Sequence, residues 1–136
     1  MKYEVRTMEK TQQKKIESFT DLNVWKEGHK FVLSVYRESQ GFPKEELFGL
    51  TSQLRRAVVS FTSNIAEGFS RSTYPDKIHF YIMAVGSLTE SQNQILIARD
   101  LKYLSKEKFN ELAEQTIILS KMANGLIKAS KSRLNS

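Results

Sequence analysis

Residues 44–71, KEELFGLTSQLRRAVVSFTSNIAEGFSR, decide the fold of this chain. Apolar side chains recur there at spacings of three and four, which is the period of an amphipathic α-helix with one buried face. The expected helix is about 40 Å long, so it needs partners of similar length. Asn64 is a polar residue on the expected seam, and one buried amide of this kind fixes helix register or oligomer state. The seam reads Leu47, Leu50, Leu54, Ala57, Phe61, Asn64 and Gly68, with Val58, Ile65 and Phe69 beside it.

Another amphipathic helix precedes this one. Thr20 is its expected N-cap, and Gly41 and Pro43 end it, because glycine readily adopts the left-handed conformation and proline cannot continue a helix. Two apolar stripes run along it, which is more than one bundle seam requires, so part of this surface is expected to face another subunit. The first stripe is Leu22, Trp25, His29, Val32 and Tyr36, and the second is Val24, Phe31 and Val35.

Two further helices follow residue 71. Ser72 and Thr73, followed by Pro75 and Asp76, are typical of a helix cap and first turn, and this helix is expected to end near Tyr103. Ser105 is the expected cap of the last helix. The third helix should bury Ile78, Tyr81 or Ile82, Val85, Leu88, Gln92, Ile95 and Arg99. The fourth should bury Phe109, Leu112, Thr116, Leu119, Ala123 and Leu126, with Ile118, Met122 and Ile127 beside them.

Long helices joined by short connections must lie antiparallel to their sequence neighbours. The sequence therefore predicts an all-α fold, an antiparallel up-down-up-down four-helix bundle over residues 19–136. Residues 1–18 are polar, show no sustained period and are expected to form a flexible N-terminal arm. The tail KASKSRLNS, residues 128–136, is expected to fray. A chain of 136 residues has the size of one domain.

Composition excludes several functional classes. The chain has no cysteine, so it holds no disulfide framework and no thiolate metal site, and a reducing compartment such as the cytoplasm is expected. No apolar run is long enough for a membrane span, and no secretory signal is evident. The two histidines do not form the Glu-x-x-His pairs of a di-metal bundle, and nucleophile-elbow and phosphate-loop motifs are missing. We therefore expect no enzyme, no metal and no cofactor.

The formal net charge of +6 gathers toward the two ends of the chain. A basic surface favours nucleic acid, because contacts to phosphates release condensed counterions. A run of exposed lysines on a helix is also typical of a solvated face, and both interpretations stay open. The residues expected to contact nucleic acid are Arg55, Arg56, Arg71, Lys121, Lys128, Lys131 and Arg133.

Polar residues of the second and third helices are candidates for setting the register of a helical hairpin. If the two helices turn near residue 73, residues whose numbers sum to about 146 lie at the same level. Arg55 and Arg56 then have two interpretations, a nucleic-acid contact or a cross-helix pair. The expected pairs are Arg56 with Glu90, Arg55 with Gln92, and Glu67 with both His79 and Arg71.

Three segments together resemble the 23S rRNA intervening-sequence protein family. They are DLNVWKEGHK at 21–30, FPKEELFGLTSQLRRAVVSFTSNIAEGFSR at 42–71 and AVGSLTE at 84–90, and the resemblance spans residues 19–127. It implies a bacterial, cytoplasmic four-helix bundle that assembles as a homopentamer around a central channel, with nucleic acid as the suspected partner. The family is also similar in fold to the accessory variability protein of diversity-generating retroelements.

Together, charge and resemblance predict a non-enzymatic homo-oligomer that binds RNA or DNA through its basic surface, and the resemblance implies that this oligomer is a pentamer. The alternative hypothesis is a scaffold or adaptor that recruits a protein partner and does not touch nucleic acid. No membrane partner is expected.

Overall fold

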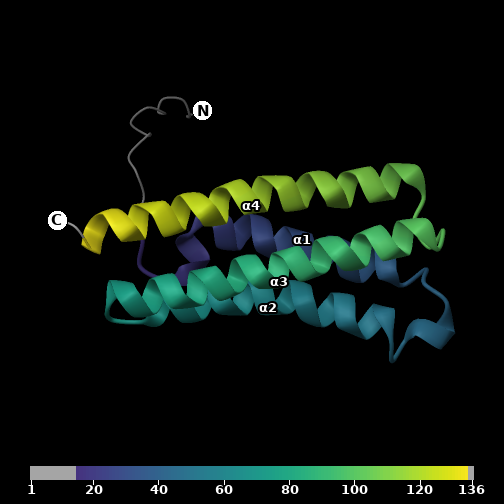
Figure 1. Ribbon diagram of the computed structural model, residues 1–136, viewed down its shortest axis with the longest axis horizontal. Helices are drawn as coiled ribbons and strands as arrows, with labels where there is room; N and C mark the ends of the chain where they lie inside the picture. Colours follow the sequence, from purple (N-terminus) through teal and green to yellow (C-terminus); the bar gives the residue numbers. More distant parts are fainter. Residues whose placement is uncertain (1–14, 135–136) are drawn as a thin grey trace, which may run out of the picture.

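The structure, a computed structural model, describes residues 15–134 and forms an antiparallel bundle of four long helices (Figure 1). Each long helix packs against its sequence neighbours, and α1 also packs against α4, so the four helices stand at the corners of a square. The described part of the chain contains no strand. The predicted fold class is therefore confirmed. The elements are η2 (Phe19–Asp21), α1 (Asn23–Ser39), η3 (Lys44–Glu46), α2 (Leu50–Ser70), α3 (Tyr74–Asp100) and α4 (Lys106–Leu134).

The two ends of the chain were expected to lack regular structure. Most of the predicted N-terminal arm, residues 1–14, and the last two residues of the tail lie outside the described residues. Within the described part, the prediction for the tail was wrong, because α4 continues to Leu134. Ala129 and Lys131 have high helix propensity, which favours continuation of the helix. Ser130 is buried against the bundle.

The chain enters the bundle through a short 3-10 turn. Ser18, and not Thr20 as predicted, is the capping residue: its hydroxyl accepts from the backbone of Thr20, and the carboxylate of Asp21 accepts from the Ser18 amide at 3.1 Å. This reciprocal arrangement is a capping box. Leu22, in an extended conformation, separates η2 from α1, which begins at Asn23 without a side-chain cap.

The buried face of α1 differs from the prediction. Its buried residues include Val24, Phe31 and Val35, the stripe that was expected to be surplus. The other stripe lies at the edge of the bundle, with Tyr36 and His29 exposed. Gly28 explains the difference: a Cβ there would lie 2.8 Å from Cε2 of Phe61, so the helices meet across a glycine that an apolar count does not register.

Helix α2 begins at Leu50, six residues later than predicted, after the separate turn η3. The carboxylate of Glu46 accepts from the Leu50 amide at 3.1 Å and so satisfies an end of the new helix. Asn64 is not buried on the seam: its amide donates to the Ser60 carbonyl of the same helix at 2.9 Å. No hydrogen bond of Asn64 to another helix therefore supports its predicted register role within the described residues.

The helical hairpin of α2 and α3 has the predicted register. The hydroxyl oxygens of Ser60 and Ser87 lie 2.8 Å apart, and the Lys77 ammonium donates to the Phe69 carbonyl at 2.6 Å. The Thr73 hydroxyl accepts from the amide of Asp76, as the predicted cap requires.

Helices α3 and α4 differ from the predicted seams at several positions. Of the two alternatives in α3, Tyr81 is buried and Ile82 is exposed, and Arg99 is exposed as well. Ser105 caps α4 as predicted, its hydroxyl accepting from the Lys108 amide at 3.1 Å, but Ile118 is exposed. Small and polar residues that the pattern did not assign complete the core of these helices: Ala84, Ser91, Gln94, Ala98 and Ser130.

Candidate nucleic-acid interface

The C-terminal half of α4 carries positive charge without any carboxylate. The sequence has no aspartate or glutamate from residue 115 to 134. Lys121, Lys128 and Lys131 are exposed there, and none forms an ion pair with another described residue. Lys121 and Lys128 are two turns apart on one face, and Lys131 follows one turn later, so the three ammonium groups extend over about 15 Å of helix. We call these three lysines the α4 stripe.

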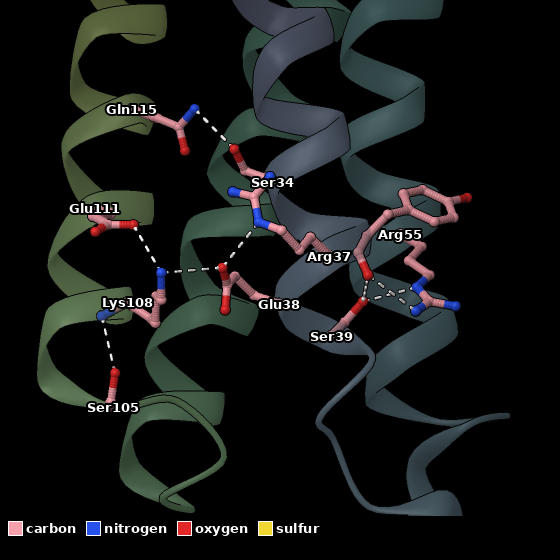
Figure 2. Close-up of polar contacts among 10 residues, drawn as sticks. Ser34, Arg37, Glu38, Ser39, Arg55, Ser105, Lys108, Glu111 and Gln115 are labelled. Carbon is pink, nitrogen blue, oxygen red and sulfur yellow. Dashed lines mark hydrogen bonds and ion pairs between the residues drawn. The ribbon is translucent and has the colours of Figure 1, made fainter.

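The N-terminal half of α4 has a different electrostatic character. Lys108 lies between two carboxylates, 3.6 Å from Glu38 of α1 and 3.7 Å from Glu111 of α4 (Figure 2). Arg37 approaches the same Glu38 at 3.3 Å. Charges of both signs neutralise one another here, so the excess charge of the helix lies in its C-terminal half.

Arg133 lies near the α2–α3 turn at the same end of the bundle (Figure 1). Its guanidinium carbon is 6.0 Å from the ring centre of Tyr74, and with Lys77 it lines a hollow of about 210 Å³. Burial lowers the pKa of Lys77 below its ordinary value of 10.5. Lys77 was not predicted as a site residue, since only the fold brings it beside Arg133.

Arg71 is less available than the α4 stripe. Its guanidinium donates to the Glu67 carboxylate at 2.7 Å, which is the predicted contact one turn along the helix, and it also lies 4.5 Å from the ring centre of Phe80. The predicted pair of Glu67 with His79 is wrong, since His79 is exposed and its ring lies edge-on to Phe80. Glu67 is already engaged by the nearer cation.

Arg55 joins α2 to α1, and not to α3 as predicted. Its Nε donates to the Ser39 hydroxyl at 2.8 Å and a terminal nitrogen donates to the Tyr36 carbonyl at 3.4 Å (Figure 2). The guanidinium also covers the Tyr36 ring, with 4.7 Å between its carbon and the ring centre. Gln92, its predicted partner, donates instead to Thr116 of α4 at 3.1 Å. Arg55 thus fixes a helix pair and is a poor candidate for a phosphate contact.

The predicted pair of Arg56 and Glu90 is not formed. Glu90 accepts from the side-chain amide of Gln94 on its own helix at 3.1 Å. Arg56 is exposed and has no ion pair within the described part of the chain. The hairpin register is as predicted, but Arg56 lies exposed beside Tyr36 and Phe48 at the α1–α2 connection, and Glu90 contacts its own helix.

The described residues hold no cluster of three or more histidine, aspartate or glutamate side chains that could bind a metal ion. None of the helices in residues 15–134 has the length and apolarity of a membrane span.

Sequence comparison places the chain among known proteins. The family described as 23S rRNA-intervening sequence protein matches residues 20–125, most of the chain. The chain belongs to this family. Among curated proteins none matches significantly in sequence. A similar solved structure is that of a protein with unknown function from the S23 ribosomal protein family of Bacteroides thetaiotaomicron, with a TM-score of 0.72 and 18% identity over 77% of this chain and 95% of that one. At that identity, the likeness supports the fold alone.

Proposed function

We propose that this 23S rRNA-intervening sequence protein is a non-enzymatic homopentamer that binds RNA or DNA through its basic surface. The α4 stripe carries the proposal, because three exposed lysines lie on a helix segment with no carboxylate to neutralise them. The cytoplasm is the expected compartment, since a cysteine-free chain fits reducing conditions.

The chemistry of the α4 stripe suits a phosphate backbone better than a base sequence. Ammonium groups on flexible stems act as point charges that neutralise phosphates and release counterions. No aromatic residue lies between Lys121 and Lys131 to stack on a base. We therefore infer binding without strong sequence preference.

Assembly would strengthen such binding. Several copies in one ring present several stripes to one polyanion, and linked weak contacts gain affinity through high effective concentration. A basic oligomer beside nucleic acid is also what the resemblance to the accessory variability protein of diversity-generating retroelements implies, and that relation stays a prediction.

Charge reversal tests the proposal directly. The variant Lys121→Glu, Lys128→Glu and Lys131→Glu is compared with a control, Lys26→Glu, Lys44→Glu and Lys106→Glu, which changes net charge equally through exposed lysines outside the α4 stripe. Binding to a structured RNA and to duplex DNA is measured by fluorescence anisotropy at low salt. We expect the stripe variant to lose at least about tenfold in affinity and the control to lose much less. Equal losses, or none, would contradict a localised interface.

The mass of the assembly is measured by light scattering before and after nuclease treatment. A pentamer mass that persists after treatment supports protein-driven assembly. A mass that falls to that of a single chain shows that nucleic acid alone held the copies together, and contradicts the pentamer.

A second candidate function, a scaffold that recruits a different protein, is favoured by exposed apolar side chains at the α1–α2 connection. Phe48 is 91% exposed there. Loss of a protein partner on substitution of Phe48, with unchanged nucleic-acid binding and unchanged mass, would support the scaffold.

A further inference from the structure

An exposed apolar patch lies where α1 meets the start of α2. Its central residue is Phe48, which is 91% exposed, beside a hollow of about 470 Å³. An aromatic side chain left this far in water is unfavourable for an isolated chain and typical of an interaction site. We call the surface the Phe48 patch, and its main residues are Tyr36, Leu47, Phe48, Arg56 and Val59.

The backbone that carries Phe48 is held firmly. The carboxylate of Glu46 accepts from the Leu50 amide at 3.1 Å and from the Tyr103 hydroxyl at 3.0 Å, which ties the start of α2 to the α3–α4 turn. The Gly49 amide donates to the Glu46 carbonyl at 2.9 Å. A side chain presented on an ordered turn loses little conformational entropy on binding, so this arrangement favours association.

A second apolar surface lies between α3 and α4. It is a groove of about 260 Å³, with Leu96 42% exposed and Ile117 52% exposed at its mouth. Few polar groups interrupt it, so it offers an apolar side chain a largely dry environment. We call it the Leu96 groove, and its main residues are Gln92, Leu96, Phe109, Ala113 and Ile117.

The two surfaces are placed to meet each other in neighbouring copies. The α1–α2 face and the α3–α4 face share no helix, so they lie on opposite sides of the square bundle. Both lie at the end of the bundle that holds the α1–α2 connection and the α3–α4 turn (Figure 1). Their level along the bundle axis is therefore similar.

Charge adds to the fit. Arg56, in the Phe48 patch, has no ion pair within the described residues. Glu114 lies one turn before Ile117 on α4, is exposed, and is likewise unpaired within residues 15–134. A cation beside one surface and a carboxylate beside the other give complementary rims, which favour this partner and this orientation.

We propose that the Phe48 patch of one copy docks into the Leu96 groove of a second copy of this chain. The contact is head-to-tail, so each copy uses both surfaces. Because both lie at a similar level, each repeat adds little shift along the bundle axis. A head-to-tail contact of this kind closes into a ring where the rotation between neighbouring copies divides a full turn evenly, as the proposed pentamer requires. This inference rests on the oligomer of the proposed function and assigns the residues that build it.

Complementary variants test the contact. Phe48→Glu damages only the patch, and Ile117→Glu damages only the groove. We expect each variant alone to be monomeric, at a mass near 15.7 kDa by light scattering. An equimolar mixture should form a heterodimer of about twice that mass, because the intact Phe48 of one variant still fits the intact groove of the other. Leu101→Glu, an exposed apolar residue of the α3–α4 turn outside both surfaces, should assemble like the unmodified chain.

Circular dichroism and thermal unfolding check that the variants fold. We expect that they do, because all three substituted side chains are exposed. Assembly that persists in both variants would overturn the proposal, and so would a mixture that stays monomeric. An unmodified chain that is monomeric after nuclease treatment would also overturn it and would assign Phe48 to another partner. Nucleic-acid binding is read separately with the α4 stripe variant, so failure of the ring contact and failure of that function are different results.

Discussion

Gly28 of α1 lies against the phenyl ring of Phe61 of α2, so closely that a Cβ atom on the glycine would stand 2.8 Å from Cε2 of that ring. Phe61 is fully buried, so its ring can move away only by displacing neighbouring core side chains. Gly28→Ala therefore combines a helix-propensity gain of about 1 kcal/mol with an overpacking cost of about 1–3 kcal/mol. We expect a net loss of stability in urea unfolding.

Gly125→Ala is the matched control for this substitution. Gly125 also lies inside a helix, but a Cβ there meets nothing within 4 Å. The propensity term then acts alone, and we expect a gain of up to about 1 kcal/mol. Equal effects at the two positions would show that the α1–α2 contact does not depend on the glycine.

The same contact shows what the sequence could and could not predict. Apolar spacing and short connections can be seen in the sequence itself. They predict the four amphipathic helices, the order of these helices and the register of the hairpin. The buried face of α1 could not be predicted in this way. Gly28 has no side chain, so an apolar pattern does not mark it, yet this absence lets α1 approach Phe61. The start of α2 was missed for a related reason: a capping carboxylate, Glu46, and a glycine interrupt an apolar pattern that continues across them.

Arg55 and Ser39 form a second relationship between α1 and α2 that can be measured. Ser39 is 3% exposed, and its hydroxyl accepts from Arg55 at 2.8 Å. In a double-mutant cycle with Arg55→Gln and Ser39→Ala, we expect a coupling energy of about 0.5–1.5 kcal/mol. Arg56→Gln, a neighbouring exposed arginine, should change stability by less than about 0.5 kcal/mol. Additive effects of Arg55→Gln and Ser39→Ala would argue against the contact.

The cross-helix pairs show the limit of register as a predictor. Helix spacing places Arg55 and Gln92 at one level, but rotation about each helix axis decides which neighbour a side chain meets. Arg55 turns toward α1 and Gln92 toward α4. The α4 stripe could be named from the sequence, because it needs only a helix without carboxylates. The Leu96 groove could not, since it exists only where two helices approach.

The hydrogen bond from Tyr103 to Glu46 predicts a pH dependence of stability. This bond, burial, and the charges of Glu46 and Glu45 raise the pKa of Tyr103 above its ordinary value of 10.0. The folded protein thus holds the phenol proton more tightly than the unfolded chain does. The resulting stabilisation is fully present below about pH 10 and is lost as pH rises through the raised pKa.

We therefore expect Tyr103→Phe to be less stable than the unmodified protein at pH 7, and expect this difference to shrink above about pH 10. Urea unfolding of both proteins from pH 7 to pH 11 measures it. Burial also raises the pKa of Tyr81, so the variant keeps part of the alkaline loss of stability. A difference that stays constant across this range would exclude Tyr103 as the titrating group.

The salt dependence of nucleic-acid binding gives the final prediction. A lysine that contacts a phosphate releases about one counterion, so each such lysine adds about 0.9 to the slope of log affinity against log salt for duplex DNA. Lys128→Gln should reduce the slope by about 1 for each engaged copy and weaken binding equally for unrelated sequences. Lys26→Gln removes an exposed lysine of α1 and should leave the slope unchanged. Anisotropy titrations at several salt concentrations measure the two slopes. An identical decrease of the slope in both variants would mean that total charge, and not the α4 stripe, drives binding.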